Sequence, residues 1–492
     1  MRHRYFIILL SFFMTCAHAS TDDLMTLFPL DNYDQTINTW IRPHSIDYNR
    51  VLLSPIMQKR HMDNFHKRYL APWDVAYVNH VIQQSSPDDV KTIEKEYLNF
   101  YSNKNKSKDM MGYGENFRPY PESWIKQIQK NMNLNQLDHV KFKAANRAIA
   151  VDNLYARALP TEDVHFYSHK LAGQGYPFDN LQISAVWAGT PLYIISETQD
   201  RAWSLVLTPD FIGWVKSTGI ARTSDFFIMM WVHQARRQLG AITQTHTSLM
   251  DDEKHFLFFG YVGMVFPVTK QNDRLRLTIP VADKHHNAAI KYISISKKYA
   301  AIMPLKTTPH HFATLMNTLI NRPYGWGNMN LYNDCSGELK SLLTPFGIWL
   351  PRHSSEQVSV GNMTDMSSAS PEKRIAYLME HGRKFLTLVY IKNHIFLYIG
   401  KYKDPTTKDD SYIAMTYQNV WGLKPKSTEL PNRRAVIGHA ALLPLLLEYP
   451  EDKTLKSQAA TPYFKVSFLD EPANYVKKPT KVNLRNIMSP YN

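Results

Sequence analysis

A single cysteine in a helical segment is the residue of this chain best suited to covalent chemistry. Cys335 lies in the sequence DCSG (334–337) and begins a run with helical spacing, 335–343, which ends before Pro345. A thiol at a helix N-terminus meets unpaired N–H groups and the positive end of the helix dipole, and both favour the thiolate. We therefore predict that Cys335 is a nucleophile whose thiolate forms below the ordinary thiol pKa of about 8.5.

Two residues farther along could complete a catalytic group. His394 follows a predicted two-residue turn, 392–393, and opens an apolar strand, while Gln418 lies on the polar face of an alternating segment, 412–420. A neutral imidazole can take the thiol proton, and a glutamine oxygen can hold the ring N–H and so fix the tautomer. A cysteine on a helix, a histidine on a strand and a polar residue on the next strand form a papain-like arrangement.

Five segments resemble the NlpC family of cell-wall cysteine peptidases. They are PYGWG (323–327), DCSG (334–337), FGIWLPRHSSEQ (346–357), HIFLYIG (394–400) and YQNVWG (417–422). The resemblance implies that Cys335, His394 and Gln418 are catalytic, although many relatives have histidine where Gln418 stands. It also implies cleavage of the bond between γ-D-glutamyl and a diamino acid in peptidoglycan stem peptides.

Three residues near the cysteine are candidates for binding substrate. The resemblance implies that Asp334 and Ser336 line the substrate site, and Arg352 could meet a substrate carboxylate. Each charged residue has a structural alternative, because Asp334 could cap the helix and Arg352 could form a structural salt bridge. In the family an aromatic residue of the first barrel also reaches the cleft, and Phe211 is our candidate for it.

Looser similarities extend to the N-terminal half. LSP (53–55), QKRH (58–61), APW (71–73), RALPT (157–161) and GWV (213–215) resemble multidomain members with a stabilising segment and two SH3-like barrels. We expect a multidomain fold with a mostly helical N-terminal segment, two small β-barrels and a papain-like α+β peptidase domain. The expected parts are a signal peptide (1–19), the stabilising segment (20–138), the barrels (139–221 and 222–306), the peptidase domain (307–449) and an irregular tail (450–492) packed in part on the rest.

The N-terminus has the features of an export signal. Arg2 and Arg4 precede an apolar stretch, 5–14, and Ala17-His18-Ala19 matches a cleavage site. The stretch is about half the ~20 residues of a membrane span, so we expect a periplasmic or secreted protein without a stable membrane span. A retained anchor and lipidation of Cys16 are the alternatives. Cleavage near Ala19 would leave Cys335 as the only cysteine, excluding an intramolecular disulfide.

The net charge and the sequence motifs limit the classes of molecule that the chain is expected to bind. The net charge is +14, from 57 basic and 43 acidic residues, which suits a polyanion such as carboxylate-rich peptidoglycan. No zinc-finger, helix-turn-helix or base-stacking motif supports nucleic-acid binding. His285 and His286 lack a third ligand at useful spacing, so we expect no metal and no other cofactor. We expect a monomer whose partner is peptidoglycan or its peptide fragments.

Three functions remain open at this point. The first is the cysteine endopeptidase of peptidoglycan. The second is a thiol amidohydrolase or acyltransferase on another substrate, because a Cys–His pair does not specify its acyl group. The third is a non-enzymatic wall-binding protein in which the barrels act and the catalytic residues are relict, and the intact Cys335, His394 and Gln418 argue against it.

Overall fold

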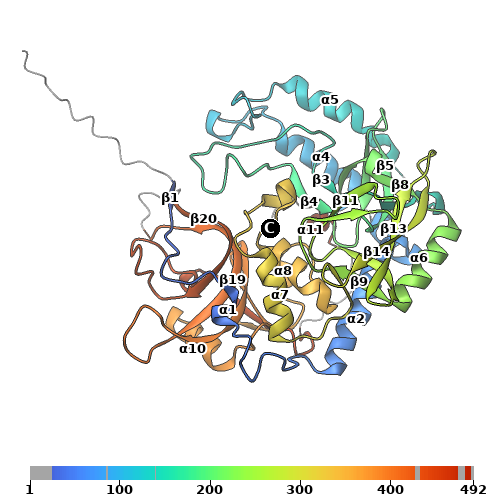
Figure 1. Ribbon diagram of the computed structural model, residues 1–492. Coiled ribbons are helices and arrows are strands. Elements are labelled where there is room, and N and C mark those ends of the chain that lie inside the picture. Colours follow the sequence, from blue (N-terminus) through green and yellow to red (C-terminus); the bar gives the residue numbers. More distant parts are fainter. Residues whose placement is uncertain (1–24, 85–86, 139, 427–432, 475–482, 489–492) are drawn as a thin grey trace, which may run out of the picture.

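The structure is a computed structural model that describes residues 25–84, 87–138, 140–426, 433–474 and 483–488 (Figure 1). The export signal and Cys16 lie outside the described residues. The predicted multidomain fold class is confirmed, with a mostly helical N-terminal segment, two barrel-like β regions and an α+β region. Among the described residues, no helix has both the length and the apolar character that crossing a membrane requires.

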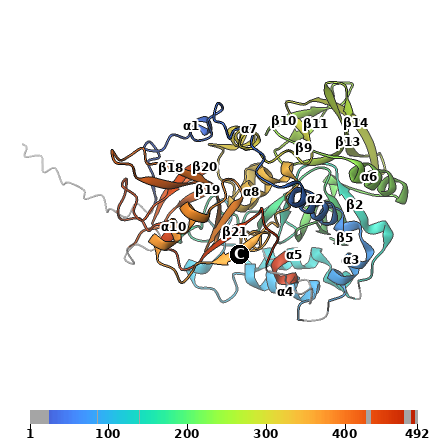
Figure 2. The same ribbon diagram turned by 90° about the horizontal axis from the view of Figure 1, so that it is seen from below.

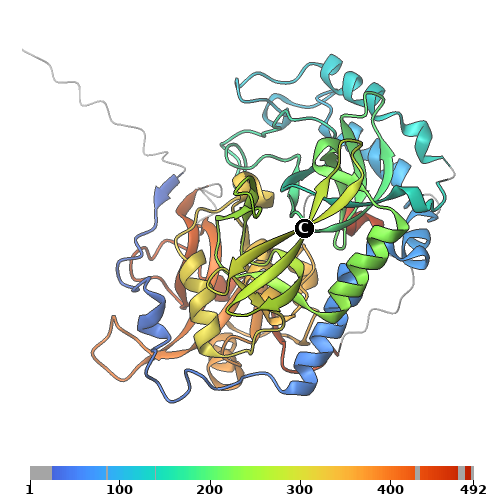
Figure 3. The same cartoon turned by 45° about the vertical axis from the view of Figure 1, so that its right-hand side comes forward.

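The N-terminal segment runs along the outside of the other parts (Figure 1). Side-chain caps at Ser54, Asp74 and Asp89 begin three of its helices, as expected for residues that accept bonds from unpaired N–H groups. Its main elements are β1 (Met25–Leu27), α1 (Ile37–Trp40), α2 (Pro55–Tyr69), α3 (Val75–Ile82), α4 (Val90–Tyr101) and α5 (Glu122–Met132). Figure 3 brings α2 (blue) forward beside α6 (green), and His66 Nε2 lies 3.2 Å from the Ala235 carbonyl oxygen between these helices.

The first barrel is a strongly bent antiparallel sheet with the order β4-β3-β7-β6-β5-β2-β8. Its core includes the fully buried Trp214, whose indole Nε1 donates to Glu94 on α4 at 3.0 Å. Its strands are β2 (Arg147–Ala150), β3 (Leu154–Arg157), β4 (Gln182–Val186), β5 (Pro191–Glu197), β6 (Trp203–Leu207), β7 (Ile212–Lys216) and β8 (Ile220–Arg222).

The second barrel follows helix α6 (Asp225–Arg237). Five strands pair in the order β14-β13-β12-β9-β15, and the hairpin β10-β11 is separate. They are β9 (Leu239–Ile242), β10 (Thr247–Met250), β11 (Phe256–Gly260), β12 (Val265–Gln271), β13 (Arg274–Ala282), β14 (Ala288–Ser296) and β15 (Ala300–Ile302). The neighbouring His285 and His286 are exposed between β13 and β14.

The C-terminal region is a seven-stranded sheet with helices on both faces. The strand order is β1-β20-β19-β18-β17-β21-β16, and only the β1–β20 pair is parallel. Helix α8 (Cys335–Leu343) packs on one face and α10 (Pro371–His381) on the other. The remaining elements are α7 (Pro309–Leu319), α9 (Ser354–Gln357), β16 (Asn362–Asp365), β17 (Thr387–Ile391), β18 (His394–Lys403), β19 (Tyr412–Leu423), β20 (Arg434–Leu445) and β21 (Phe464–Phe468).

The expectation that the tail at 450–492 is irregular is wrong for Phe464–Phe468 and Leu484–Met488, which form a strand and a helix; residues 475–482 and 489–492 lie outside the described part of the chain. β21 pairs with β17 on one side and β16 on the other, so the tail supplies an interior strand of the sheet. Alternate residues of β21, such as Phe464 and Val466, are fully buried. Burial of these apolar side chains stabilises this short strand in the sheet. Farther on, α11 (Leu484–Met488) lies beside α4, where Arg485 pairs with Asp88 and Glu96 (Figure 2).

Candidate active site

Helix α8 begins at Cys335 because Asp334 caps it. The Asp334 Oδ1 atom accepts a hydrogen bond from the Gly337 N–H at 2.8 Å, which satisfies one of the unpaired donors of the first turn. Cys335 therefore follows directly on the cap, and 8 % of its surface is exposed. Its side chain belongs to the hydrophobic core between α8 and the sheet.

His394 is the first residue of β18 and is held by Gln418 on β19. Ile391 pairs with His394 across the two-residue turn at 392–393, as the sequence predicts. His394 Nε2 lies 2.7 Å from Gln418 Oε1, and Gln418 is fully buried. Because an amide oxygen only accepts, Nε2 carries the ring proton and Nδ1 is left free to take a proton.

Gln418 is itself fixed by two further side chains. Its Nε2 donates to Thr416 Oγ1 at 3.0 Å, and its Oε1 accepts from Gln458 Nε2 at 2.8 Å. These partners decide which end of the amide faces His394. The sequence offered no signal for Gln458, because it comes from the segment expected to be irregular.

Burial leaves the thiol and the imidazole neutral. Burial raises the pKa of Cys335 to about 12, and the negative charge of Asp334 adds to this, while the neighbouring Ile395 N–H acts in the opposite direction. Burial also lowers the pKa of His394 to about 4. The expected thiolate below the ordinary pKa is therefore not what this structure supports, because loss of solvent outweighs the position at the helix N-terminus.

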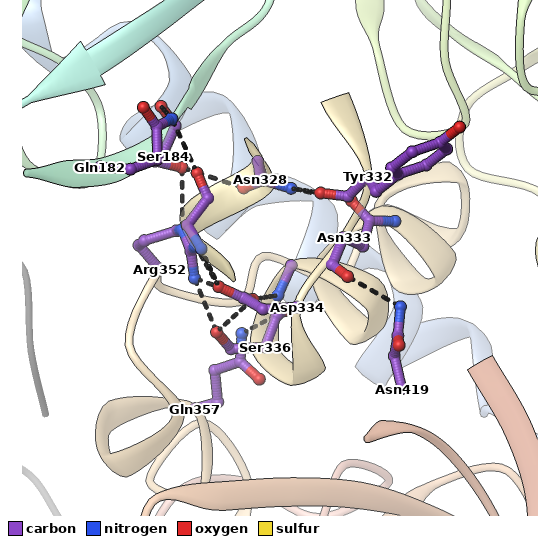
Figure 4. A network of polar contacts seen from close by, with 12 residues as sticks. Gln182, Ser184, Asn328, Tyr332, Asn333, Asp334, Ser336, Arg352, Gln357 and Asn419 are labelled. Atoms are coloured by element: carbon purple, nitrogen blue, oxygen red, sulfur yellow. Dashed lines mark hydrogen bonds and ion pairs between the residues drawn. The ribbon is translucent and has the colours of Figure 1, made fainter. Parts of the chain in front are cut away.

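Asp334, Ser336 and Arg352 form one buried polar network with the first barrel (Figure 4). Arg352 Nη2 pairs with Asp334 Oδ2 at 2.5 Å, Arg352 Nη1 donates to Ser336 Oγ at 2.7 Å, and Arg352 Nε donates to Ser184 Oγ at 2.8 Å. Burial by itself raises the pKa of Asp334, but the Arg352 charge and hydrogen bonds hold it below its ordinary value. Asp334 therefore caps the helix, and Arg352 forms a structural salt bridge with it, so both structural alternatives are present.

A second network joins the segment before Cys335 to the strand that carries Gln418 (Figure 4). Asn419 Nδ2 donates to the Asn333 carbonyl oxygen at 2.8 Å, and Asn333 Nδ2 donates to Glu338 Oε2 at 2.8 Å. Tyr417 donates its hydroxyl to the other Glu338 oxygen. Residues on both sides of Gln418 therefore contact the start of α8. Sequence reasoning missed these contacts because they join residues far apart in the chain.

Comparisons with known proteins show which domains the chain resembles. The N-terminal residues 5–136 match the model of the NLPC_P60 stabilising domain, residues 165–216 that of an SH3 domain of SH3b1 type, and residues 224–272 that of an SH3 domain of SH3b2 type. An NlpC/P60 endopeptidase from Photobacterium damselae subsp. piscicida has 26% identity and a TM-score of 0.76, over 91% of this chain and 100% of that chain. The chain thus carries the stabilising domain and the two SH3 domains of multidomain NlpC/P60 proteins, and its fold is similar to that of an NlpC/P60 endopeptidase.

Two further comparisons gave a distant similarity and no match. An NlpC/P60 family protein from Bacillus cereus ATCC 10987 has 13% identity and a TM-score of 0.41, over 63% of this chain and 98% of that chain. No curated protein matches the chain.

The first barrel reaches the site through Phe178. Its ring packs against Tyr324 (6.4 Å between centroids), Trp326 (5.5 Å) and Trp421 (5.2 Å) of the C-terminal region. Our candidate for that position, Phe211, lies elsewhere. It lines a cavity of about 90 Å³ between the two barrels, α2 and the side of α8 that carries Lys340, and Cys335 is not among the lining residues.

The described residues contain one group that could hold a metal ion. Ligand atoms of Asp251, Glu253 and His255 lie within 4.8 Å of one another. Asp251 Oδ2 already accepts from Lys291 Nζ at 2.6 Å, so this cluster is accounted for by an ion pair on the second barrel. It belongs to a different part of the molecule from Cys335.

Proposed function

We propose that this protein is an exported cysteine endopeptidase that hydrolyses peptidoglycan stem peptides at the γ-D-glutamyl–diamino acid bond. The observation that carries the proposal is the arrangement of three residues: Cys335 at the start of α8, His394 at the start of β18, and the 2.7 Å contact from His394 to Gln418. The relative from Photobacterium damselae, described as an endopeptidase, supports the reaction class.

The residues act in two steps in this mechanism. His394 Nδ1 takes the thiol proton as Cys335 Sγ attacks the amide carbonyl, and the Cys335 backbone N–H donates to the developing oxyanion. The imidazolium then gives its proton to the leaving amine, and water hydrolyses the acyl-enzyme. Gln418 keeps the ring N–H on Nε2 throughout and adds no charge.

Asp334, Ser336 and Arg352 are proposed to bind the stem peptide. They link the nucleophile segment to Ser184 of the first barrel, and Phe178 brings the same barrel against Trp326 and Trp421. A barrel this close to the site would restrict it sterically, so stems with a free N-terminal L-alanine should be cleaved faster than stems joined to muramic acid. Equal rates on the two would remove the steric argument.

Digestion of purified sacculi and of free stem peptides, followed by mass spectrometry, tests the function. The wild type should release fragments cut at the γ-D-glutamyl bond, and Cys335→Ala should release none. If the protein binds sacculi but releases no product, and if the thiol of Cys335 is inert, the result would favour a non-enzymatic wall-binding protein. A thiol that reacts with amide substrates but leaves peptidoglycan intact would favour the amidohydrolase or acyltransferase.

A further inference from the structure

Glu338 is a buried carboxylate that the proposed mechanism does not use. It lies three residues after Cys335 on α8, on the same side of the helix, and 1% of its surface is exposed. Burial raises the pKa of Glu338, and hydrogen bonds from Tyr417 and Asn333 oppose this shift. A buried carboxylate lowers stability unless its bonds compensate, and an apolar residue in its place is often as stable. Stability alone therefore does not account for a carboxylate at this position.

The two oxygens of Glu338 accept hydrogen bonds from two segments that are far apart in the sequence. Oε1 accepts from the Tyr417 hydroxyl on β19, and Oε2 accepts from Asn333 Nδ2 at 2.8 Å. Tyr417 directly precedes Gln418, and Asn333 directly precedes the cap of α8. One carboxylate thus joins the segment that leads into Cys335 to the strand that carries Gln418.

The segment before α8 depends on its contacts, because part of its backbone is unfavourable. Asn328 and Asn330 adopt left-handed conformations, with φ of 61° and 54°. Such residues cost free energy and persist only where the surrounding structure holds them. Asn328 Nδ2 donates to Asn333 Oδ1 at 2.9 Å, so the amide nitrogen of Asn333 is turned toward Glu338. The Asn333 carbonyl oxygen also accepts from Asn419 Nδ2 at 2.8 Å (Figure 4), so two contacts hold this segment against β19.

The proposed reaction depends on the distance between the two sides that Glu338 joins. Cys335 lies on one side, and on the other side His394 Nε2 lies 2.7 Å from Gln418 Oε1. Proton transfer from the thiol to the imidazole requires hydrogen-bond reach, and a displacement of about 1 Å can lower the rate by about 100-fold. A contact that fixes the start of α8 against β19 therefore affects catalysis directly.

We propose that Glu338 is a positioning residue that holds Cys335 within proton-transfer reach of His394. It does so by joining Asn333 to Tyr417. This inference rests on the proposed function and adds a residue that sets the geometry of its nucleophile and base. Because Glu338 acts through these segments and not on the substrate, its loss should lower kcat with less change in KM.

Substitution of Glu338, assayed on a free L-Ala-γ-D-Glu-diamino acid peptide, tests this role. Glu338→Leu removes both acceptors at similar volume and should lower kcat by about 10- to 100-fold, with KM within about threefold of the wild type. Glu338→Gln keeps one oxygen for Asn333 and can donate to the Tyr417 hydroxyl, so it should retain kcat within about fivefold. Leu315→Ala is the control for lost stability, because Leu315 on α7 is 1% exposed in the same hydrophobic core. It should leave the kcat of the folded protein unchanged.

Tyr417→Phe decides the question if Glu338→Leu does not fold. It removes one of the two donors to Glu338 and should lower kcat by about 3- to 10-fold. Where Glu338→Leu folds, adding Tyr417→Phe should cause no further loss of kcat, because the two residues act in one network. An unchanged kcat in Tyr417→Phe, or losses that add in the double variant, would overturn the inference.

Crystal structures of the wild type and of Glu338→Leu give a readout that does not require activity. The distance from Cys335 Sγ to His394 Nδ1 should be longer in the variant by about 0.5 Å or more. An unchanged distance, equal losses of kcat in Glu338→Leu and Leu315→Ala, or equal losses in Glu338→Leu and Glu338→Gln would overturn the inference while the peptidase function stands. If the wild type cleaves no stem peptide, the proposed function fails, and the distance comparison alone decides the positioning role.

Discussion

At the scale of single residues, the state of the thiol is decided by burial. Cys335 has the helix position that favours a thiolate, yet it sits in a core where the charged form loses its hydration. Burial also lowers the pKa of His394 and so favours the neutral form of its ring. The pair therefore starts as thiol and imidazole, and charge separation accompanies attack on the substrate.

This neutral pair predicts the pH profile. The base form of His394 is the neutral ring, which is lost as pH falls through its pKa of about 4, well below the ordinary 6.5. We expect kcat/KM to stay level through neutral pH and to fall only near pH 4. With Cys335→Ser as the blank, the ultraviolet absorbance of thiolate should stay absent up to at least pH 9, since burial raises the pKa of Cys335 to about 12. A thiolate that titrates below about 8.5 would contradict this.

Gln418 has a positioning role that substitution can test. Gln418→Ala removes the acceptor of the His394 Nε2–H, so the tautomer is no longer held, and kcat should fall by roughly 10- to 1000-fold with less change in KM. Gln418→His should retain much of the activity, because a ring nitrogen can accept the same bond. Full activity of Gln418→Ala would show that Gln418 does not hold the ring.

At the scale of elements, β21 completes the sheet that presents His394 and Gln418. Val466 is fully buried and pairs with Val389 on one side and Thr364 on the other. The strand thus lies inside the sheet although it belongs to the C-terminal 40 or so residues of the chain. Its removal would leave β17, the partner of β18, as an unpaired edge.

A proline in β21 should unfold this region. Val466→Pro removes a backbone donor and places a ring inside a two-sided ladder, so the free energy of unfolding should fall by at least about 3 kcal/mol. Denaturant unfolding followed by circular dichroism measures the change. Lys465→Ala on the same strand is the control and should stay within about 0.5 kcal/mol of the wild type. A proline variant as stable as the control would contradict the placement of β21.

At the scale of the whole molecule, the parts share hydrophobic cores. Trp40 of the N-terminal segment packs into the core of α7, α8 and the sheet, where its ring meets Tyr402 edge-on at 5.2 Å. Phe65 of α2 packs against Trp349 at 5.1 Å, in a core that also includes residues of both barrels. β1 adds a strand to the C-terminal sheet. The region 307–449 therefore depends on segments outside it.

These shared cores predict cooperative unfolding. Trp40→Ala should lower the free energy of unfolding by about 3–5 kcal/mol, as for other large buried side chains, and should destabilise the region around Cys335 as well. Ile46→Ala, at a site that is 99% exposed, is the control. Calorimetry should show one transition for the wild type. Two independent transitions, or a stable isolated fragment 307–449, would contradict the shared cores.

Features that depend on neighbours along the chain could be predicted from the sequence alone. The helix at 335–343, the turn at 392–393 and the side of β19 on which Gln418 lies follow from capping residues, turn residues and alternation, which are local properties. The role of Cys335 itself stays a prediction until activity is measured. The similarity of short motifs to those of a known family also predicted the order of the domains.

The other features of the site became visible only once the chain was folded. Gln458, Asn419, Phe178 and the interior position of β21 depend on contacts between residues far apart in the chain, and a single sequence carries no signal of which segments meet. The same reason explains why the protonation state of the Cys335 thiol differs from the state predicted from the sequence. Its position at the helix start is local and favours the charged form, but its burial comes from packing against the sheet, and burial has the larger effect on the pKa.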